Sequence, residues 1–467
     1  MRLNASQAVE VALEHARGIH GVIDLVAFSS HESSASLRWA NNTLTTNGYG
    51  WSNHLTVVAY VALGGGVAIA SLSENDPAFD AGFVRGLVDK TIRSARTAVP
   101  ANHGLLVTPS VYGDWDAAAV STDLDVLGLI TPELGEALKR GTVNGRDHSG
   151  YAEHVRESSW TGSLSGLRLR EDSQDGRIEM TSRAERGLRS AWVGLHSRTF
   201  TDIDVSALDV ALERQLKWQL VRKELPAGRY RTILGPGPVG DLLSSFDSNL
   251  IGRDAIEGSG PFARAGGQTL LGERIAGRTG FDLFSDPAYP GVEGSPYVVD
   301  TDNGPTSSVF DTGQRFGRTE WVRDGVLSAL CTTREVASRS GLAYNPDGTN
   351  LILSVDGGRG TLDEVIARTE HGLLVNCLWY IRDLDEATMT VTGTTRDGVY
   401  EVRDGEVVAA VNNFRFNESP LSILGRIHEA GSPEICQTRE NAEMSLDYVM
   451  PTLVVDDFSM SSVSEAS

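Results

Sequence analysis

The sequence predicts an α+β protein, in which an N-terminal α/β region precedes a mainly antiparallel β C-terminal domain. Two observations support this prediction. In the first half, apolar residues recur at helical spacing in a few capped segments, and alternating runs lie between them. The second half has few long helical patterns, many short apolar runs and fourteen glycines between Gly228 and Gly294. We therefore expect strands joined by long ordered loops in the second half.

Three domains are expected from the length and from the segment boundaries. A chain of 467 residues corresponds to about two to four structural units. We place an N-terminal α/β domain at 1–100, a central α+β domain at 101–225 and a β-rich domain at 226–460. The second boundary rests on Pro226 and Gly228, which end a helical pattern.

The expected helices follow from capping residues and apolar spacing. Asn4 and Gln7 form a capping-box pattern at the start of the first helix. A helix over 205–223 presents leucines at every fourth position on one face. Thr361 and Glu364 form a second capping box.

The expected strands follow from alternating or continuous apolar runs and from turn residues. In the N-terminal half they cover 22–28, 34–46, 55–63 and 67–70, and in the C-terminal half 230–234, 373–380, 389–394, 399–403 and 407–411. Glycines 64–66 predict a turn between two of these strands. Asp175-Gly176 predicts a hairpin between 167–170 and 177–181, and Asp404-Gly405 predicts another.

Composition excludes several classes of partner. The chain carries 41 basic and 62 acidic residues, a net charge of −21. Nucleic acid needs a basic surface, so we expect neither nucleic acid nor an anionic membrane as a partner. Only three cysteines occur, Cys331, Cys377 and Cys436, without a CxxC pair, which fits a reducing compartment. Because the N-terminus lacks a secretory signal pattern, we expect a cytoplasmic protein.

The segment from Gly235 to Gly240 has the GxGxxG spacing of a nucleotide-binding loop. Two of its positions, Pro236 and Pro238, are prolines, which have no backbone N–H to donate to a phosphate. No clean strand ending in an acidic residue follows about twenty residues later. We therefore interpret the segment as a rigid structural turn, followed by a possible helix over 241–250.

The histidines and cysteines offer no local metal or nucleophile motif. His31-Glu32 and His428-Glu429 each begin like HExxH, but neither has the second histidine. We expect structural roles for the ten histidines. The minor alternative is a zinc site formed by residues that are distant in the sequence. Cys331 and Cys377 lie in apolar segments and are expected in the core.

Several segments together resemble the TldD/TldE (PmbA) family, once described as modulators of DNA gyrase and now regarded as metalloproteases. These segments are spread over nearly the whole chain. They are 38–47, 233–237, 372–375, 398–407, 432–436 and the later tripeptide Pro451-Thr452-Leu453.

The resemblance implies where a zinc site would lie. In catalytic TldD-type subunits an HExxxH segment follows the Gly-Pro-Gly turn and a cysteine near the C-terminus completes the site. Here Ser244 and Asn249 stand at the histidine positions and Ser245 at the glutamate position, while Cys436 matches the cysteine. Serine and asparagine are poor zinc ligands, and serine cannot replace the carboxylate as a base.

The resemblance therefore implies a TldE-like subunit that pairs with a TldD-type catalytic subunit to cleave unfolded or extended peptides. We expect no catalytic residue, metal or cofactor in this chain, with zinc in the partner. Two alternatives are a stand-alone peptide-binding scaffold and a hydrolase with a rearranged metal site that uses Cys436 and His428. Four aromatic residues of the C-terminal domain are candidate dimer contacts or core residues: Trp379, Tyr380, Phe414 and Phe416.

Overall fold

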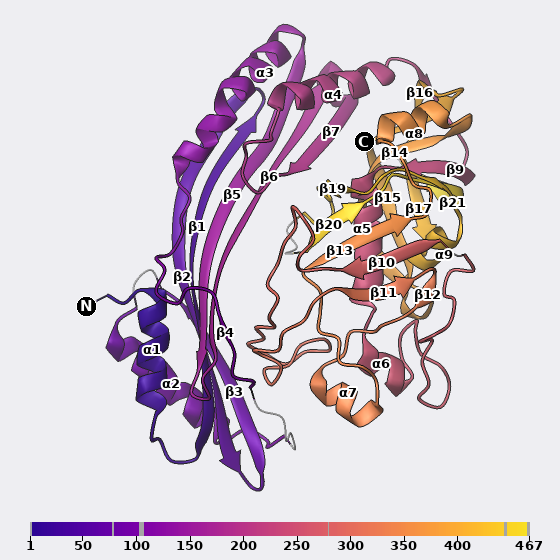
Figure 1. Ribbon diagram of the computed structural model, residues 1–467. Coiled ribbons are helices and arrows are strands. Elements are labelled where there is room, and N and C mark those ends of the chain that lie inside the picture. Colours follow the sequence, from indigo (N-terminus) through magenta and orange to yellow (C-terminus); the bar gives the residue numbers. More distant parts are fainter. Residues whose placement is uncertain (1, 77–78, 102–106, 279, 443–445, 465–467) are drawn as a thin grey trace.

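The computed structural model describes residues 2–76, 79–101, 107–278, 280–442 and 446–464. Two units face one another: a long curved sheet from the first half of the chain, and a thicker β-rich body from the second half (Figure 1). Most strand pairings are antiparallel, so the predicted α+β fold class is confirmed. Within these described ranges, no helix is long and apolar enough to span a membrane.

The N-terminal unit is one seven-stranded sheet in the order β3-β2-β1-β5-β6-β4, with β7 paired to β6. Its strands are β1 (Val22–Ala40), β2 (Thr43–Leu63), β3 (Gly66–Asn75), β4 (Val111–Tyr112), β5 (Arg146–Ser163), β6 (Arg168–Ala184) and β7 (Arg189–His196). Only the pairing of β4 with β6 is parallel.

Helices cover this sheet in two separate groups, one at each end of the long strands (Figure 1). The elements are α1 (Ala5–Ala16), α2 (Ala81–Ala95), η1 (Leu124–Leu129), α3 (Thr131–Val143), η2 (Glu185–Gly187) and α4 (Val205–Trp218). Helices α1 and α2 share a core with β1 and β2, in which Leu13, Leu25 and Val57 are fully buried. Helices α3 and α4 pack over the other end, where Leu134 and Ile178 are buried. The capping box of Asn4 and Gln7 is confirmed.

The boundary expected at residue 100 lies inside this unit. Strand β1 pairs with β2 on one side and with β5 on the other, from Val26 to Trp39. Strand β2 comes from the expected domain 1–100 and β5 from the expected domain 101–225, and both satisfy backbone hydrogen bonds of β1. The two expected domains therefore form a single sheet.

Two local predictions in this half were wrong. The strand expected over 34–46 is split by a turn at Asn41 and Asn42, both at positive φ, so β1 and β2 form one long hairpin. The hairpin expected at Asp175-Gly176 does not form, because β6 runs straight through and pairs with β5. A Cβ at Gly176 would lie 2.4 Å from the carbonyl oxygen of Ser197, so the glycine permits close backbone approach rather than a turn.

The C-terminal unit holds two sheets, with strand orders β12-β11-β10-β13-β20-β19 and β14-β9-β21-β17-β15-β16-β8. Its strands are β8 (Arg222–Lys223), β9 (Gly228–Leu234), β10 (Phe281–Ser285), β11 (Thr319–Arg323), β12 (Val326–Leu327), β13 (Asn350–Val355), β14 (His371–Asp385), β15 (Thr390–Arg403), β16 (Glu406–Val411), β17 (Phe414–Glu418), β18 (Ile427–Ala430), β19 (Glu434–Cys436), β20 (Asp447–Met450) and β21 (Leu453–Val463). Its helices are α5 (Pro236–Ser248), α6 (Gly252–Glu257), α7 (Arg334–Ser340), α8 (Leu362–Arg368), η3 (Glu386–Thr388) and α9 (Pro420–Gly425).

A second pairing, of β14 with β15, closes five strands of the larger sheet into a ring: β14, β9, β21, β17 and β15. Helix α5 shares one core with both sheets, in which Leu242 and Phe246 pack with residues such as Leu283 and Phe414. The hairpin predicted at Asp404-Gly405 joins β15 and β16 and is confirmed.

Candidate functional site

Helix α5 carries the positions that the resemblance marks. It begins at Pro236, five residues earlier than expected, with Gly235 as its N-cap residue. Prolines fit the first turn, because the N–H groups there have no partner inside the helix. The interpretation of this segment as structural therefore agrees with its geometry. One face of the helix is buried through Leu242, Leu243 and Phe246, so its other side is left to contact neighbouring loops.

Ser244, Ser245 and Asn249 use their polar groups locally. The hydroxyl of Ser244 donates to the carbonyl oxygen of Asp241 at 2.9 Å and accepts from the Asn441 amide at 2.8 Å. The Asn249 amide donates to the carbonyl oxygen of Ser245 at 2.7 Å. The Ser245 hydroxyl oxygen is buried and has no hydrogen-bond partner among the described residues. Zinc prefers thiolate, imidazole and carboxylate ligands, so this set does not fit a zinc ion.

Asp241 anchors the loop that follows β19. Its carboxylate accepts the backbone N–H groups of Arg439 at 3.1 Å, Glu440 at 3.0 Å and Asn441 at 3.2 Å. Burial raises the pKa of Asp241 to about 7, although the three N–H groups favour the charged form. The carboxylate thus fixes residues 439–441 against α5.

Cys436 lies beside this anchor, as the resemblance implies. It ends β19, which packs against α5. Its sulfur lies 3.7 Å from the carbonyl oxygen of Tyr448. Burial, followed by the nearby charge of Asp241, raises the pKa of the thiol far above its usual value. The thiol is therefore protonated at neutral pH when no metal ion is bound to it.

His428 is not part of this arrangement. It lies on β18, which pairs with β21, whereas Cys436 lies on β19, which pairs with β20 in the other sheet. The ring Nδ1 of His428 is 3.4 Å from a carboxylate oxygen of Asp456.

An acidic region adjoins the outer side of α5. Burial raises the pKa of Asp247 to about 7, and the charge of Asp347 adds to the shift. Burial also raises the pKa of Asp300 to about 7, assisted by the charges of three neighbouring aspartates. Nearby Cys331 is buried, and burial raises its pKa well above the usual value. Cys331 and Cys377 are both in the core, as predicted. A positively charged ligand would stabilise the ionised carboxylates of this region.

Arg439 connects the two units. Its guanidinium lies between two indole rings, 5.0 Å from the centroid of Trp192 on β7 and 5.2 Å from that of Trp379 on β14. It forms an ion pair with Asp397 and donates to the sulfur of Cys377 at 3.1 Å. Burial nevertheless raises the pKa of Cys377 to about 12. The loop that Asp241 anchors therefore also holds the N-terminal sheet against the C-terminal body.

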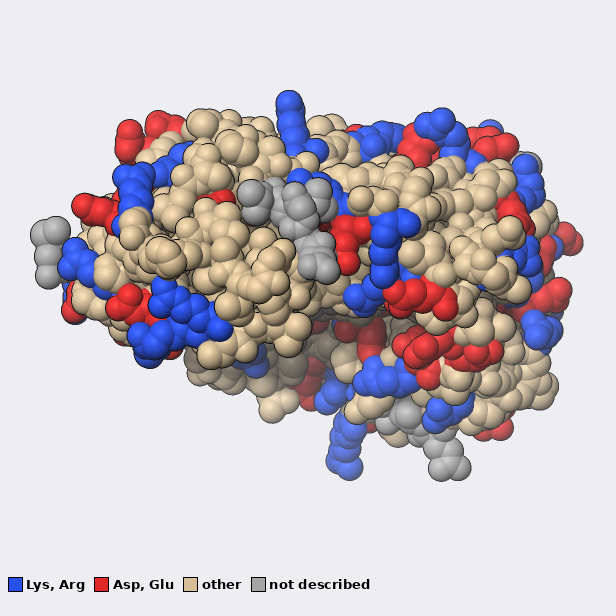
Figure 2. Space-filling view, turned by 90° about the horizontal axis from the view of Figure 1, so that it is seen from below, with Lys and Arg blue, Asp and Glu red and all other residues tan. Residues whose placement is uncertain are grey.

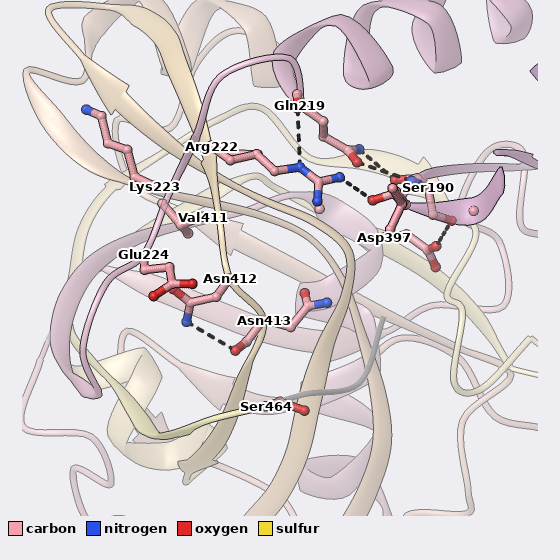
Figure 3. A pocket seen from close by; sticks show the side chains of 14 residues that line it. Ser190, Gln219, Arg222, Lys223, Glu224, Asp397, Val411, Asn412, Asn413 and Ser464 are labelled. Carbon is pink, nitrogen blue, oxygen red and sulfur yellow. Dashed lines mark hydrogen bonds between the residues drawn. The ribbon is translucent and has the colours of Figure 1, made fainter. Parts of the chain in front are cut away.

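A pocket of about 420 Å³ lies at this junction (Figure 3). Ser190, Gln219 and Asp397 stand at one end, and Lys223 and Glu224 at the other. Ser190 donates to Asp397, and Gln219 donates to the carbonyl oxygen of Ser190 at 2.6 Å. The polar groups at the first end are therefore already paired with one another.

The larger cavity, of about 910 Å³, separates the sheet from the C-terminal body. Charged side chains of both signs line this cavity. The sheet contributes Arg156, Arg170 and Glu171, and the C-terminal body contributes Glu293 and the aromatic Tyr297. Figure 2 shows acidic and basic side chains interspersed on the face seen from below, without a continuous basic surface. Its volume falls within the range of about 300–1,000 Å³ that is common for ligand sites.

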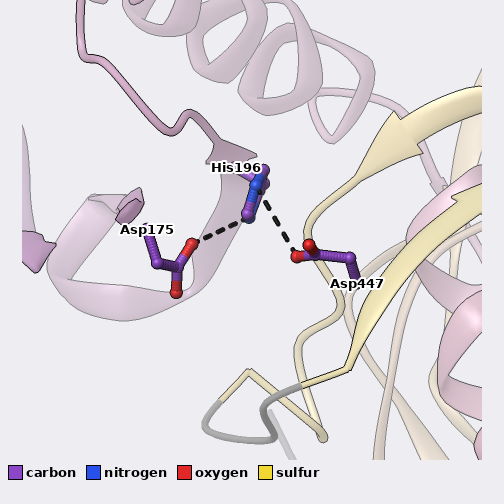
Figure 4. A group of neighbouring side chains, drawn as sticks. All are labelled: Asp175, His196 and Asp447. Carbon is purple, nitrogen blue, oxygen red and sulfur yellow. Dashed lines mark ion pairs between the residues drawn. The ribbon is translucent and has the colours of Figure 1, made fainter. Parts of the chain in front are cut away.

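A histidine lies between two carboxylates across the junction (Figure 4). His196, at the end of β7, has Nδ1 3.4 Å from Asp175 and Nε2 3.7 Å from Asp447 on β20. Arg198 also donates to Asp447 at 2.8 Å. Each ring nitrogen faces a different carboxylate, so His196 links a residue of the sheet to a residue of the C-terminal body. Sequence reasoning missed this group, since Asp447 lies far from the other two along the chain.

Comparisons with known proteins agree with this geometry. A model of the PmbA/TldA metallopeptidase C-terminal domain matches residues 227–462, about half of the chain. No curated protein sequence matches the chain. The solved structure of TldE from Thermococcus kodakarensis is similar, with a TM-score of 0.75 and 13% identity, covering 97% of this chain and 99% of that one.

Two other solved structures are similar, both described as candidate modulators of DNA gyrase. The one from Bacteroides thetaiotaomicron has a TM-score of 0.72 and 17% identity, and 97% of each chain is covered. The one from Thermotoga maritima has a TM-score of 0.71 and 14% identity, covering 93% of this chain and 96% of that one. At these identities the likeness shows the fold alone.

Proposed function

The chain belongs to the PmbA/TldD metallopeptidase family, and from that premise we propose that it is the TldE-like, non-catalytic subunit of a two-subunit metalloprotease. The observation that carries the proposal is the chemistry of α5. Ser244, Ser245 and Asn249 stand where the family's HExxxH segment is expected, and their side chains offer hydroxyls and an amide. These groups neither hold zinc nor supply a general base.

In this proposal the chain acts by stabilising a TldD-type partner, which holds the zinc, and by forming part of the wall of the substrate cavity. The cavity of about 910 Å³ supports this role, because its mixed charges and its aromatic Tyr297 suit an extended peptide. The anchored loop 439–441 supports it too, because it keeps a remodelled site rigid without a metal ion.

The test is reconstitution. The chain and a homologue that carries HExxxH would be co-expressed, co-purified and assayed with an unfolded peptide, with zinc measured by elemental analysis. We expect the chain alone to hold zinc far below one equivalent and to cleave nothing, and the complex to cleave the peptide in a chelator-sensitive way. Tight stoichiometric zinc in the chain alone, with chelator-sensitive cleavage, would overturn the proposal.

A stand-alone peptide-binding scaffold is the second candidate, and the same cavity favours it. Fluorescence anisotropy of a labelled unfolded peptide with the chain alone separates the two: binding without any partner favours the scaffold. The third alternative, a hydrolase that uses Cys436 and His428, has no support from the geometry, since these residues lie in different sheets.

A further inference from the structure

His196 and Asp447 face one another across the junction of the two units with a gap between them (Figure 4). The Nε2 atom of His196 lies 3.7 Å from Oδ1 of Asp447, which is too long for a hydrogen bond. This nitrogen is buried and has no hydrogen-bond partner among the described residues, and the side chain of His196 is only 12% exposed. A buried polar atom without a partner indicates that another group, such as an ion, satisfies it.

The gap has the width that a metal ion requires. Divalent transition metals bind imidazole nitrogen and carboxylate oxygen at about 2.0–2.2 Å. Two bonds of about 2.1 Å that meet at an angle of about 120° place the nitrogen and the oxygen about 3.6 Å apart. The observed separation of 3.7 Å is nearly the same, so an ion fits between His196 and Asp447 without a movement of either strand.

The imidazole of His196 has the surroundings of a metal ligand. Its other nitrogen, Nδ1, faces Oδ1 of Asp175 at 3.4 Å, and metal-binding histidines usually direct their second N–H to a carboxylate. The same oxygen of Asp175 accepts the backbone N–H of Gly176 at 2.7 Å, which fixes the carboxylate. With its proton on Nδ1, the ring directs the lone pair of Nε2 toward Asp447.

Asp447 is also held in place, and the charges around it favour a cation. Arg198 donates to Oδ2 of Asp447 at 2.8 Å, so Oδ1 is left for another partner. Arg198 forms a second ion pair with Glu293 at 3.4 Å. Asp175, Asp447 and Glu293 together carry three negative charges against one positive charge on Arg198. A divalent cation would cancel the two negative charges in excess.

We propose that His196 and Asp447 bind a divalent transition-metal cation such as Mn²⁺, and that Asp175 positions the imidazole for it. One imidazole and one carboxylate, with water in the other positions, suit a borderline or hard ion, and no thiolate belongs to the group. The ion joins β7 of the N-terminal sheet to β20 of the C-terminal body. Arg198 and Glu293 also line the larger cavity, so the ion fixes the separation of two walls of that cavity.

This site is separate from α5, and the inference does not depend on the proposed catalytic partner. Two protein ligands hold an ion weakly, so the ion exchanges with solvent and is lost on gel filtration. The chain purified without added metal is therefore still expected to contain zinc far below one equivalent. Binding of added Mn²⁺ and zinc content after purification are distinct measurements, and either can fail without the other.

The test titrates the full chain, freed of metal with a chelator and then gel-filtered, with MnCl₂ while the EPR signal of free Mn²⁺ is recorded. The wild type is expected to bind one Mn²⁺ per chain. His196→Ala and Asp447→Asn should each lower the affinity more than about tenfold, and Asp175→Asn about tenfold. His428→Ala removes another histidine that lies 3.4 Å from an aspartate, so it is the matched control and should bind as the wild type does.

Pulsed EPR of the bound Mn²⁺ identifies the ligand directly. We expect coupling to one imidazole nitrogen in the wild type and in His428→Ala, and no such coupling in the residual binding of His196→Ala. Circular dichroism checks that each variant keeps the fold. Absence of binding at about 1 mM Mn²⁺ would overturn the proposal and would leave water or a protonated imidazole in the gap. Binding without nitrogen coupling, or with the same affinity in His196→Ala and Asp447→Asn, would overturn it as well.

Discussion

Asp241 and Asn441 are joined through both the backbone and the side chain of the asparagine. The Asp241 carboxylate accepts the Asn441 backbone N–H at 3.2 Å and its amide at 3.3 Å. The same amide donates to Ser244 at 2.8 Å. One aspartate and one asparagine thus keep α5 and the loop after β19 together.

Replacing Asp241 should loosen this loop. Asp241→Ala leaves three partly buried backbone N–H groups without this acceptor, at a cost of about 1–3 kcal/mol in the free energy of unfolding. Urea denaturation measures the loss, and hydrogen exchange should show faster exchange at Arg439, Glu440 and Asn441. Unchanged exchange at these three amides would contradict the anchoring role.

Cys436→Ser should leave the activity of a reconstituted two-subunit enzyme largely unchanged. Its thiol, whose pKa burial raises, contacts the carbonyl oxygen of Tyr448, and the helix beside it offers no histidine to complete a zinc site, so we expect the thiol to contribute packing. The expected cost in stability is within about 1 kcal/mol. Peptide cleavage is the measurement, with co-purification as the control for assembly. Loss of cleavage in a complex that still assembles would point to a chemical role for the thiol.

Asp247→Asn should stabilise the protein at alkaline pH. The folded pKa of Asp247 is about 7, above its unfolded value of 3.8, so the folded state binds more protons between these values. Stability therefore falls as pH rises through this window. The asparagine has no proton to lose, so its melting temperature should exceed that of the wild type by a few degrees at pH 8, and the difference should shrink toward pH 4.

Glu136→Gln, at an exposed position on α3, is the control for this comparison. It should change the melting temperature little at either pH. An Asp247→Asn variant that is no more stable than the wild type at pH 8 would show that the ionised carboxylate of Asp247 does not destabilise the folded protein.

Arg439→Ala should destabilise the chain by up to about 3–5 kcal/mol, because the buried Asp397 loses its close ion pair and keeps only the hydrogen bond from Ser190 and a longer ion pair, of 3.9 Å, with Arg396. Combining it with Asp397→Asn should recover part of the loss. Arg439→Lys keeps the charge but loses the flat contact with Trp192 and Trp379, so its stability should be intermediate. Urea unfolding measures all three variants, and a loss below about 1 kcal/mol for the alanine variant would refute the argument.

Tyr380→Ala should weaken capture of a TldD-type partner roughly tenfold if the C-terminal domain, about 226–460, carries most of that contact, as we predict. Tyr380 is 62% exposed, unlike Phe414 and Phe416, which are core residues. Leu220→Ala, at a similarly exposed apolar position, is the control for the general effect of removing an exposed apolar side chain. Surface plasmon resonance with the partner immobilised measures the affinity. Equal affinities for wild type and Tyr380→Ala would exclude this aromatic from the contact.

Local signals in the sequence predicted local structure. The capping boxes at Asn4 and Thr361 and the turn at Asp404-Gly405 depend on residues a few positions apart, and all three are present. Gly176 shows the limit of such signals. Its neighbour Asp175 completes a turn pattern, yet the reason for the glycine is the carbonyl of Ser197, which only the folded chain brings near.

In the candidate site, too, the sequence predicted what depends on neighbouring residues and missed what depends on distant ones. The sequence located α5 and Cys436 through the resemblance, but not the contacts between Asp241 and Asn441, because these residues are 200 positions apart in the chain. The elevated pKa of Asp247 also escaped, since it depends on burial and on Asp347. The boundary at residue 100 failed for a similar reason, since nothing within β1 indicates that β5 will pair with it.

The five-strand ring constrains how the chain folds during synthesis. Its strand β21 lies between β9 and β17, so the ring stays open until translation has passed residue 463. All strands of the N-terminal sheet are made by residue 196 and its covering helix α4 by Trp218, so this sheet and its helices can form on the ribosome while the second half is still being made. During that interval β9 has an unpaired edge until β21 is made, and unpaired strand edges favour aggregation.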